Sequence, residues 1–190
     1  MTDTKRVLVI VVDGSEEMET VISVDVLRRA GVEVTMASLE SNKNIKCSRG
    51  VNITADISLS DVEQQGGVYD CVLLPGGPGH AALVDSGVVG EVLKKQESDG
   101  RLIAAVCAAP MVLAKNNIGV GKTITSYPAF KDKLMAAGYK YDDVNTVVKD
   151  GNIITSRGPG TTFSFALEIV KNLVSEEKMK EVAAAMLVNI

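Results

Sequence analysis

The residues most capable of chemistry follow three apolar runs of the chain. Acidic side chains come after the first run, in the segment 13–19 (Asp-Gly-Ser-Glu-Glu-Met-Glu), two glycines follow a second at 75–77 (Pro-Gly-Gly), and Cys107 follows a third. Cys107 lies between an expected strand and an expected helix, with alanines two positions away on each side. This is the pattern of a nucleophile elbow, in which the N-terminus of the following helix lowers the pKa of the thiol. The spacing therefore allows Cys107 to act as a nucleophile.

The same pattern is compatible with a small buried core residue, a common role for cysteine, so both interpretations of Cys107 are open from this segment alone. Cys71 lies inside an apolar run and is expected to be inert core. Cys47 lies in a polar segment and is expected on a peripheral strand, exposed enough to be oxidised. The three cysteines form no Cys-x-x-Cys pair and are accompanied by a single histidine, His80. Neither a disulfide framework nor a metal site is expected from such a set.

Glu16, Glu17 and Glu19 open the first expected helix, where acidic residues complement the helix dipole. Their spacing places Glu16 and Glu19 on one face, with Glu17 pointing elsewhere. A carboxylate beside a thiolate raises the pKa of the thiol, so such a pair works only when the carboxyl group keeps a proton and shares it with sulfur. Gly76 and Gly77 either allow a tight turn or present N–H groups to an anion. They do not make a phosphate loop, because no Gly-Lys-Ser/Thr follows.

Apolar runs alternate with helical patterns along the chain. The expected strands cover 6–12, 32–38, 69–74 and 102–106, hairpins cover 45–54 and 145–156, and the expected helices cover 16–30, 88–98, 110–115, 161–174 and 176–187. This alternation predicts an α/β fold with a doubly wound parallel sheet, helices on both faces and a small antiparallel addition. Because there is no internal repeat or linker, residues 1–190 are expected to form a single domain. The active site of such a sheet lies beyond the carboxyl ends of its strands, where the three reactive segments fall.

Composition excludes several classes of function. The formal net charge is −4 and aromatic residues make up only 4% of the chain. The chain therefore has no nucleic-acid-binding signature, which requires clustered basic residues or stacking aromatics. The first apolar run, at 7–12, is shorter than the about 20 residues that span a membrane, and no cleavage site follows it. The protein is expected to be soluble, not exported, and without a membrane span.

Six segments, in order, resemble the DJ-1/PfpI superfamily, and within it the branch of Parkinson disease protein 7. They are GSEEME at 14–19, DVLRRAG at 25–31, CSR at 47–49, LPGG at 74–77, LIAAVCAAP at 102–110 and TSRGPGT at 155–161. The resemblance covers nearly the whole chain and implies a flavodoxin-like fold and a homodimer. It also decides between the two interpretations of Cys107 in favour of a functional cysteine.

The resemblance also implies a set of site residues. Cys107 matches the family's reactive cysteine, and Glu19 matches the glutamic acid that hydrogen-bonds to it. Gly77 and Ala108 match backbone N–H groups that face the pocket. Arg49, together with Arg29 of the partner subunit, matches arginines near the site entrance.

Two positions discriminate among branches of the family. Tyr127 stands where many relatives carry histidine, so a Cys-His dyad is in doubt, proton transfer falls to Glu19, and His80 is not assumed to replace the missing histidine. Cys107 is followed by Ala108 rather than by the histidine of protease-like branches, which argues against peptidase activity.

The resemblance implies cofactor-free glyoxalase chemistry on small 2-oxoaldehydes such as glyoxal and methylglyoxal, giving 2-hydroxy acids. Acting on early glycated adducts of amines or thiols, the same steps amount to deglycase activity, which protects against oxidative and carbonyl stress. The alternative, from another class, is a redox sensor or chaperone regulated by oxidation of Cys107. The expected location is the cytoplasm, with the nucleus and mitochondria left open.

Overall fold

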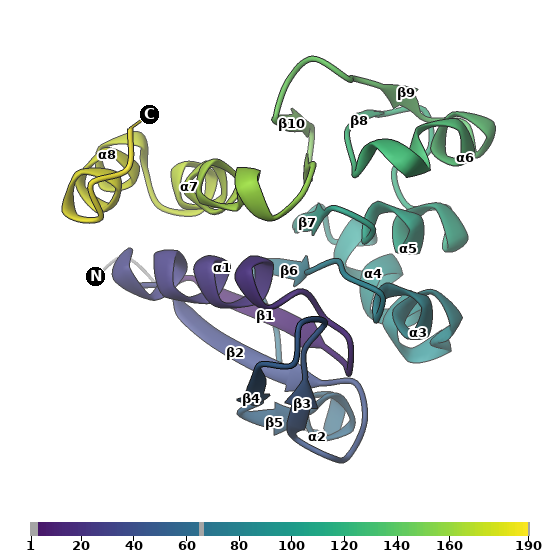
Figure 1. Ribbon diagram of the computed structural model, residues 1–190, viewed down its shortest axis with the longest axis horizontal. Coiled ribbons are helices and arrows are strands. Elements are labelled where there is room, and N and C mark those ends of the chain that lie inside the picture. The colour runs from purple at the N-terminus through teal and green to yellow at the C-terminus, as the bar shows by residue number, and fades with distance from the viewer. Residues whose placement is uncertain (1–3, 65–66, 190) are drawn as a thin grey trace.

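The computed structural model describes residues 4–64 and 67–189 and is organised around a seven-stranded sheet (Figure 1). Across the sheet the strands are β10 (Val147–Asp150), β11 (Ile153–Ser156), β7 (Leu102–Val106), β6 (Cys71–Leu74), β1 (Arg6–Val11), β2 (Glu33–Ser38) and β5 (Ile57–Ser58). Neighbouring strands pair in parallel, except that β10 and β11 form an antiparallel hairpin. The α/β fold with an antiparallel addition, predicted from the alternation of elements, is confirmed.

Helices cover both faces of the sheet. One face carries α1 (Glu17–Arg29), α7 (Thr162–Leu173) and α8 (Glu176–Ala185), and the other carries α2 (Leu59–Gln64), α3 (His80–Asp85), α4 (Gly87–Ser98), α5 (Pro110–Lys115) and α6 (Lys131–Ala136). Successive side chains of a strand point to opposite faces. Val7 and Val9 of β1 therefore enter one core, while Leu8 and Ile10 enter the other. A strand buried on both sides must be apolar at every position, which explains the unbroken run at 7–12.

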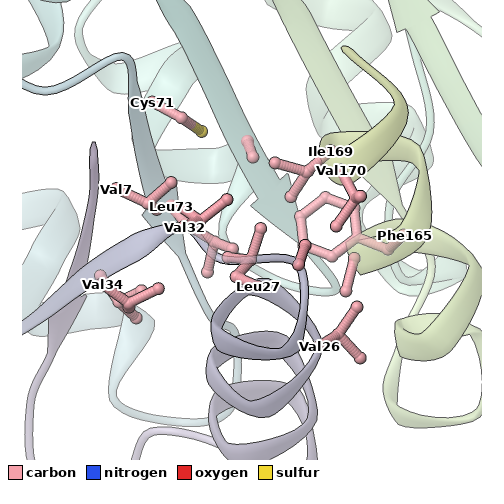
Figure 2. Packing of buried hydrophobic residues seen from close by; sticks show 14 of the residues in the cluster. Val7, Val26, Leu27, Val32, Val34, Cys71, Leu73, Phe165, Ile169 and Val170 are labelled. Atoms are coloured by element: carbon pink, nitrogen blue, oxygen red, sulfur yellow. The ribbon is translucent and has the colours of Figure 1, made fainter. Parts of the chain in front are cut away.

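The core beneath α1 and α7 fixes the position of α1 (Figure 2). Leu27 and Val26 of α1 pack in the same buried cluster as Phe165 of α7 and Leu73 of β6. Each of these side chains is fully buried, and burial of one such side chain stabilises the fold by roughly 1.5–3 kcal/mol. This packing anchors the helix whose first turn reaches the reactive end of the sheet.

Two small two-stranded sheets lie outside the central sheet. β3 (Asn44–Lys46) pairs antiparallel with β4 (Asn52–Thr54), as the sequence predicted for 45–54, and β8 (Thr123–Ile124) pairs in parallel with β9 (Lys140–Tyr141). Short 3-10 helices cover Pro128–Phe130 (η1) and Pro159–Thr161 (η2). The sequence analysis missed α2, α3, α6, β5, β8 and β9, each of which spans six residues or fewer and gives too little periodicity to be recognised.

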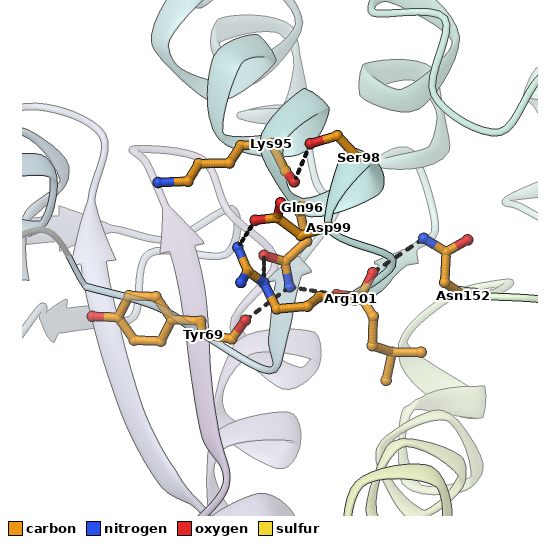
Figure 3. A network of polar contacts seen from close by, with 8 residues as sticks. Tyr69, Lys95, Gln96, Ser98, Asp99, Arg101 and Asn152 are labelled. Carbon is orange, nitrogen blue, oxygen red and sulfur yellow. Dashed lines mark hydrogen bonds and ion pairs between the residues drawn. The ribbon is translucent and has the colours of Figure 1, made fainter.

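A buried amide joins the amino-terminal ends of two central strands (Figure 3). Nε2 of Gln96, in α4, donates to the carbonyl oxygens of Tyr69 at 3.1 Å and Leu102 at 3.0 Å. Oε1 of Gln96 accepts from Nε of Arg101 at 3.3 Å, and Asn152 donates to the Arg101 carbonyl at 3.1 Å. These contacts hold β6 and β7 in register at the end of the sheet opposite the reactive segments.

Candidate active site

Cys107 occupies a strained corner directly after β7. Its backbone φ is 62°, a left-handed conformation that costs a residue other than glycine of order 1–3 kcal/mol and is concentrated at functional sites. The corner is held on both sides, because the Cys107 N–H donates to the Ser156 carbonyl at 3.0 Å and the Cys107 carbonyl accepts from the Tyr127 N–H at 2.8 Å. The side chain is partly exposed rather than buried. This is the geometry of a nucleophile elbow and not of an ordinary core cysteine.

Glu19 lies beneath this corner with its side chain wholly buried. Its Oε2 accepts from the Gly76 N–H at 2.7 Å, whereas Oε1 has no hydrogen-bond partner of ordinary geometry among the described residues. Glu16 is the N-cap of α1 and accepts from the Glu19 N–H at 2.7 Å, so it fixes the turn that carries Glu19. Burial raises the pKa of Glu19 to about 7, although the hydrogen bonds from Gly76 and Cys107 act in the opposite direction. Glu19 therefore holds a proton well above the usual range of a carboxyl group.

The glycine turn after β6 brings backbone next to both side chains. A Cβ at Gly76 would lie 2.7 Å from Cβ of Cys107, and 2.9 Å from both the Ala108 nitrogen and Oε2 of Glu19. Gly77 has a φ of 88°, and a Cβ there would lie 2.5 Å from the Gly14 carbonyl oxygen. Only glycine fits at either position.

The thiol of Cys107 does not show the lowered pKa that its place before a helix had predicted. Burial, followed by the negative charge of Glu19, raises the pKa of Cys107 to about 12, while the N–H groups of Gly77 and Ala108 lower it. α5 begins three residues after Cys107 and is only six residues long. The groups that favour negative charge on the sulfur are therefore the N–H groups of Gly77 and Ala108, and not the dipole of a long helix. When Glu19 is protonated its charge is gone, and the two acids must be treated as one coupled pair that ionises together.

Tyr127 and Arg49 stand at the surface near this end of the sheet. The Tyr127 side chain is half exposed, and its ring passes within 3.9 Å of the position a Cβ would take on Gly158. Arg49 lies in the turn after β3, where its N–H donates to Oε1 of Glu17 at 2.7 Å. Arg29 forms an ion pair with Asp25 at the far end of α1, about 15 Å along the helix from Glu19. Arg29 of the same chain is thus not part of this site.

The other two cysteines are buried. Cys71 has no exposed surface, as the sequence predicted. Cys47 directly follows the peripheral strand β3, but the prediction that it is exposed was wrong: only 4% of it is exposed, and it belongs to the core beneath α1 together with Ile45. The reason is that the β3–β4 hairpin folds back against the start of α1, where Gly14 donates to the Lys46 carbonyl at 2.8 Å.

Two contributors to the site were not assigned from the sequence. Gly76, whose N–H binds Glu19, was considered only together with Gly77 as a turn or an anion donor. Glu17 was expected to point away; its carboxylate accepts from the Ser48 hydroxyl at 2.6 Å and from the Arg49 N–H, and so ties the 47–51 turn to α1. No local signal predicts this contact, since it joins residues more than thirty positions apart.

Within the described residues, no cluster of three or more His, Cys, Asp or Glu side chains is suitable for a metal ion. The described helices also include none with the length and apolar character required to cross a bilayer. The groups that the structure brings together at the carboxyl ends of β1, β6 and β7 are a thiol, a buried carboxyl group and backbone N–H donors.

The protein combines a flavodoxin-like α/β sheet with a cysteine in a strained backbone conformation and a buried glutamic acid next to it. These features define a class of α/β proteins with a reactive cysteine at the carboxyl end of the sheet. Residues 5–172 match the model of the DJ-1/PfpI family. The chain belongs to this family.

Within the family, the chain is similar to proteins of the DJ-1 branch. It is 52% identical to protein dj-1beta of Drosophila melanogaster over 97% of this chain and 98% of the relative, and 52% identical to the Parkinson disease protein 7 homolog of Danio rerio over 96% and 97%. It is also 43% identical to the glutathione-independent glyoxalase DJR-1.2 of Caenorhabditis elegans over 87% of each chain. The crystal structure of Drosophila melanogaster DJ-1beta superposes with a TM-score of 0.95 at 51% identity, covering 99% of this chain and 100% of that one.

Proposed function

We propose that the protein is a cofactor-independent glyoxalase and deglycase that uses Cys107 as its nucleophile. The observation that carries the proposal is the buried Glu19 carboxyl group, whose pKa is raised to about 7 by burial and which interacts with the Cys107 thiol. A carboxyl group with a pKa near the working pH is suited to both give and take a proton. The relative named as a glutathione-independent glyoxalase, 43% identical, supports the same reaction class.

The reaction begins when the Cys107 sulfur attacks the aldehyde carbon of methylglyoxal and Glu19 relays the thiol proton to the aldehyde oxygen, which gives a hemithioacetal. The Gly77 and Ala108 N–H groups, which favour negative charge on sulfur, are placed to bind the developing oxyanion. Glu19 then moves a proton from the former aldehyde carbon to the neighbouring oxygen and back to carbon, through an enediol. The aldehyde carbon is oxidised and the ketone carbon is reduced within one molecule, so no external oxidant or cofactor is needed. Water finally cleaves the thioester and releases a 2-hydroxy acid.

We infer deglycase activity from the same steps. An early adduct of a 2-oxoaldehyde with an amine or a thiol carries the same pair of oxygen-bearing carbons. Attack by Cys107 displaces the amine or thiol, which leaves with a proton supplied by Glu19. Tyr127 is a half-exposed phenol, and the Arg49 N–H binds Glu17; from the family resemblance we propose that both border the entrance. Both are placed to affect which adducts enter, and neither is required for the proton transfer.

A second candidate function is that of a redox sensor or chaperone controlled by oxidation of Cys107. It is favoured by the partial exposure of Cys107, because peroxide reaches an accessible thiol more readily than a buried one. It is also favoured by a 37% identical relative whose structure is described as Toxoplasma gondii DJ-1, oxidized, with a TM-score of 0.90 over 98% of this chain and all of that one. The two functions share one sulfur atom and can coexist.

We further propose a homodimer that is located in the cytoplasm. α1 leaves Met18 and Val21 about half exposed, and a groove next to them is lined by Val24, Met36 and Ile53. A helix with apolar residues outside its core-facing stripe requires a second surface to cover them. In such a dimer, Arg29 of the partner subunit would be available to the entrance.

The test is a steady-state assay with methylglyoxal and detection of lactate as the product. Cys107→Ala should abolish turnover while the circular dichroism spectrum stays unchanged. Cys47→Ala and Cys71→Ala, matched controls that remove the two buried thiols, should keep most of the activity. Substantial turnover by folded Cys107→Ala protein would refute the mechanism.

A further inference from the structure

His80 is the only histidine in the chain, and no step described above uses it. It is the first residue of α3, immediately after the glycine turn. Its Nδ1 lies 2.9 Å from the carbonyl oxygen of Gly77, and its backbone N–H donates to the same oxygen at 3.1 Å. A carbonyl oxygen can only accept a hydrogen bond, so Nδ1 must carry the proton. The side chain therefore donates to Gly77 in both the neutral and the charged form of the ring.

The ring of His80 also reaches a second segment of the site. It packs edge-on against Phe130, with ring centroids 5.3 Å apart and an angle of 70° between the planes. Phe130 ends η1, which begins directly after Tyr127, and the Tyr127 N–H donates to the Cys107 carbonyl at 2.8 Å. His80 thus contacts both segments that border Cys107, the glycine turn and residues 127–130.

Gly77 joins two peptide groups that are held separately: the Gly76 carbonyl accepts from the Glu16 N–H at 3.0 Å, and the Gly77 carbonyl accepts from His80. Glycine has the widest choice of backbone conformations, so its two adjoining peptide groups can rotate more freely than those of any other residue. His80 holds the carbonyl group that follows Gly77. Fixing that carbonyl restricts the rotation about Gly77 and thereby the direction of its N–H, which faces the sulfur of Cys107.

We propose that His80 is a positioning residue: its Nδ1–H fixes the Gly77 carbonyl and so limits rotation about Gly77, whose N–H faces Cys107. The role in turnover rests on the proposed function, whereas the effect on the reactivity of Cys107 does not. Two matched variants separate the donor from the ring. In His80→Asn the amide nitrogen takes the approximate place of Nδ1 and keeps the donor without the ring, and His80→Phe keeps a ring that can contact Phe130 without the donor.

The measurement is the rate of alkylation of Cys107 by iodoacetamide from pH 5 to 10, followed by mass spectrometry of the Cys107 peptide. The ionisable side chains that influence the thiol, Glu19 directly and Glu16 through Glu19, are the same in every variant. We expect His80→Phe to lower the rate at pH 7 about fivefold, the factor for one ordinary hydrogen bond, and by a similar factor across this pH range. His80→Asn should stay within about twofold of the wild type.

Turnover of methylglyoxal by the same variants separates the two proposals. A parallel fall in kcat/KM for His80→Phe supports both. If alkylation responds as expected but the wild type itself does not turn over methylglyoxal, the proposed function fails and the positioning role stands. Wild-type alkylation in His80→Phe, or an equal loss in His80→Asn, overturns the positioning role. If His80→Phe melts at a clearly lower temperature than the wild type, His80→Leu repeats the loss of the donor in a smaller side chain and decides the question.

Discussion

Oε2 of Glu19 accepts a 2.7 Å hydrogen bond from the Gly76 N–H, while Oε1 of the same carboxyl group has no partner of ordinary geometry among the described residues. The two oxygens are therefore not equivalent: Oε2 is engaged by backbone, and Oε1 is the atom free to exchange a proton. The carboxyl group has no exposed surface. Bulk water therefore has little access to Oε1 as a donor or acceptor of the proton. This asymmetry supports a role for Glu19 as a proton shuttle next to Cys107.

The raised pKa of Glu19 predicts a pH dependence of stability. Its pKa is about 7 in the folded protein, against an ordinary value of 4.5. Its stabilising contribution is therefore complete below pH 4.5 and is lost as the pH rises to about 7, because the unfolded chain gives up the proton first. Urea unfolding of Cys107→Ala, compared with Cys107→Ala/Glu19→Gln, isolates this carboxyl group from the thiol. Relative to the Gln variant, the Glu19 protein should lose up to about 3 kcal/mol between pH 4.5 and 8; parallel curves would contradict the raised pKa.

Gly76→Ala should damage the site more than the fold. The new Cβ would be 2.7 Å from Cβ of Cys107 and 2.9 Å from Oε2 of Glu19, so at least one of them must move. Overpacking of this kind costs about 1–3 kcal/mol of stability, and a misplacement of about 1 Å costs about a hundredfold in rate. Gly87→Ala is the matched control, since nothing lies within 4 Å of its Cβ position. Steady-state assays and thermal melting check both, and an active Gly76→Ala enzyme would show that the close packing is not required.

Tyr127→Phe should lose less than about tenfold in kcat/KM, or roughly 1.4 kcal/mol. The Tyr127 side chain is half exposed, whereas the Glu19 carboxyl group that is assigned the proton transfer is fully buried. The contact of Tyr127 with Cys107 is made by its backbone N–H, which the substitution leaves in place. A thousandfold loss would mean that the phenol, and not Glu19, transfers the proton.

Mild peroxide should oxidise Cys107 to the sulfinate before it reaches Cys47 or Cys71. Cys107 is partly exposed and faces the N–H groups of Gly77 and Ala108, whereas Cys47 and Cys71 are buried. The sulfinate is an anion, and charge-assisted hydrogen bonds to it are roughly twice as strong as neutral ones. Glu19→Leu removes one donor and should lower the sulfinate yield. Peptide mass spectrometry after a peroxide titration tests the order of oxidation; earlier modification of Cys47, or an unchanged yield in Glu19→Leu, would argue against the Glu19–Cys107 pair.

The exposed apolar surface of α1 predicts a dimer at micromolar concentration. Sedimentation should give about twice the monomer mass of 20.1 kDa. Val21→Asp places a charge on this surface, where Val21 is 49% exposed, and should shift the protein toward the monomer without unfolding it. Val120→Asp is the control, a valine of similar exposure (51%) in a turn outside the α1 groove. A monomeric wild type would refute the dimer and remove Arg29 of the partner subunit from the site.

Much of the fold was predictable because its signals are local. The central strands β6 and β7, and β1 after Arg6, are continuous apolar runs, and α1, α4, α5, α7 and α8 begin and end within two residues of the predicted limits. The elbow at Cys107 was suggested but not decided locally, since a cysteine between a strand and a helix, flanked by alanines, is equally compatible with a buried core residue. The family resemblance then indicated that Glu19 belongs with Cys107.

Only the tertiary structure decided which atoms meet. Glu19 and Gly76 are separated by 57 positions, and their contact exists because β1 lies directly beside β6 in the sheet. The burial of Cys47 likewise depends on the hairpin folding onto α1, which a polar local sequence cannot reveal. The pKa of Cys107 is raised by burial and by the charge of Glu19. Both causes arise only when distant segments pack together. Local sequence thus determined the elements and the reactive residue types, while strand order and burial determined their partners and their protonation.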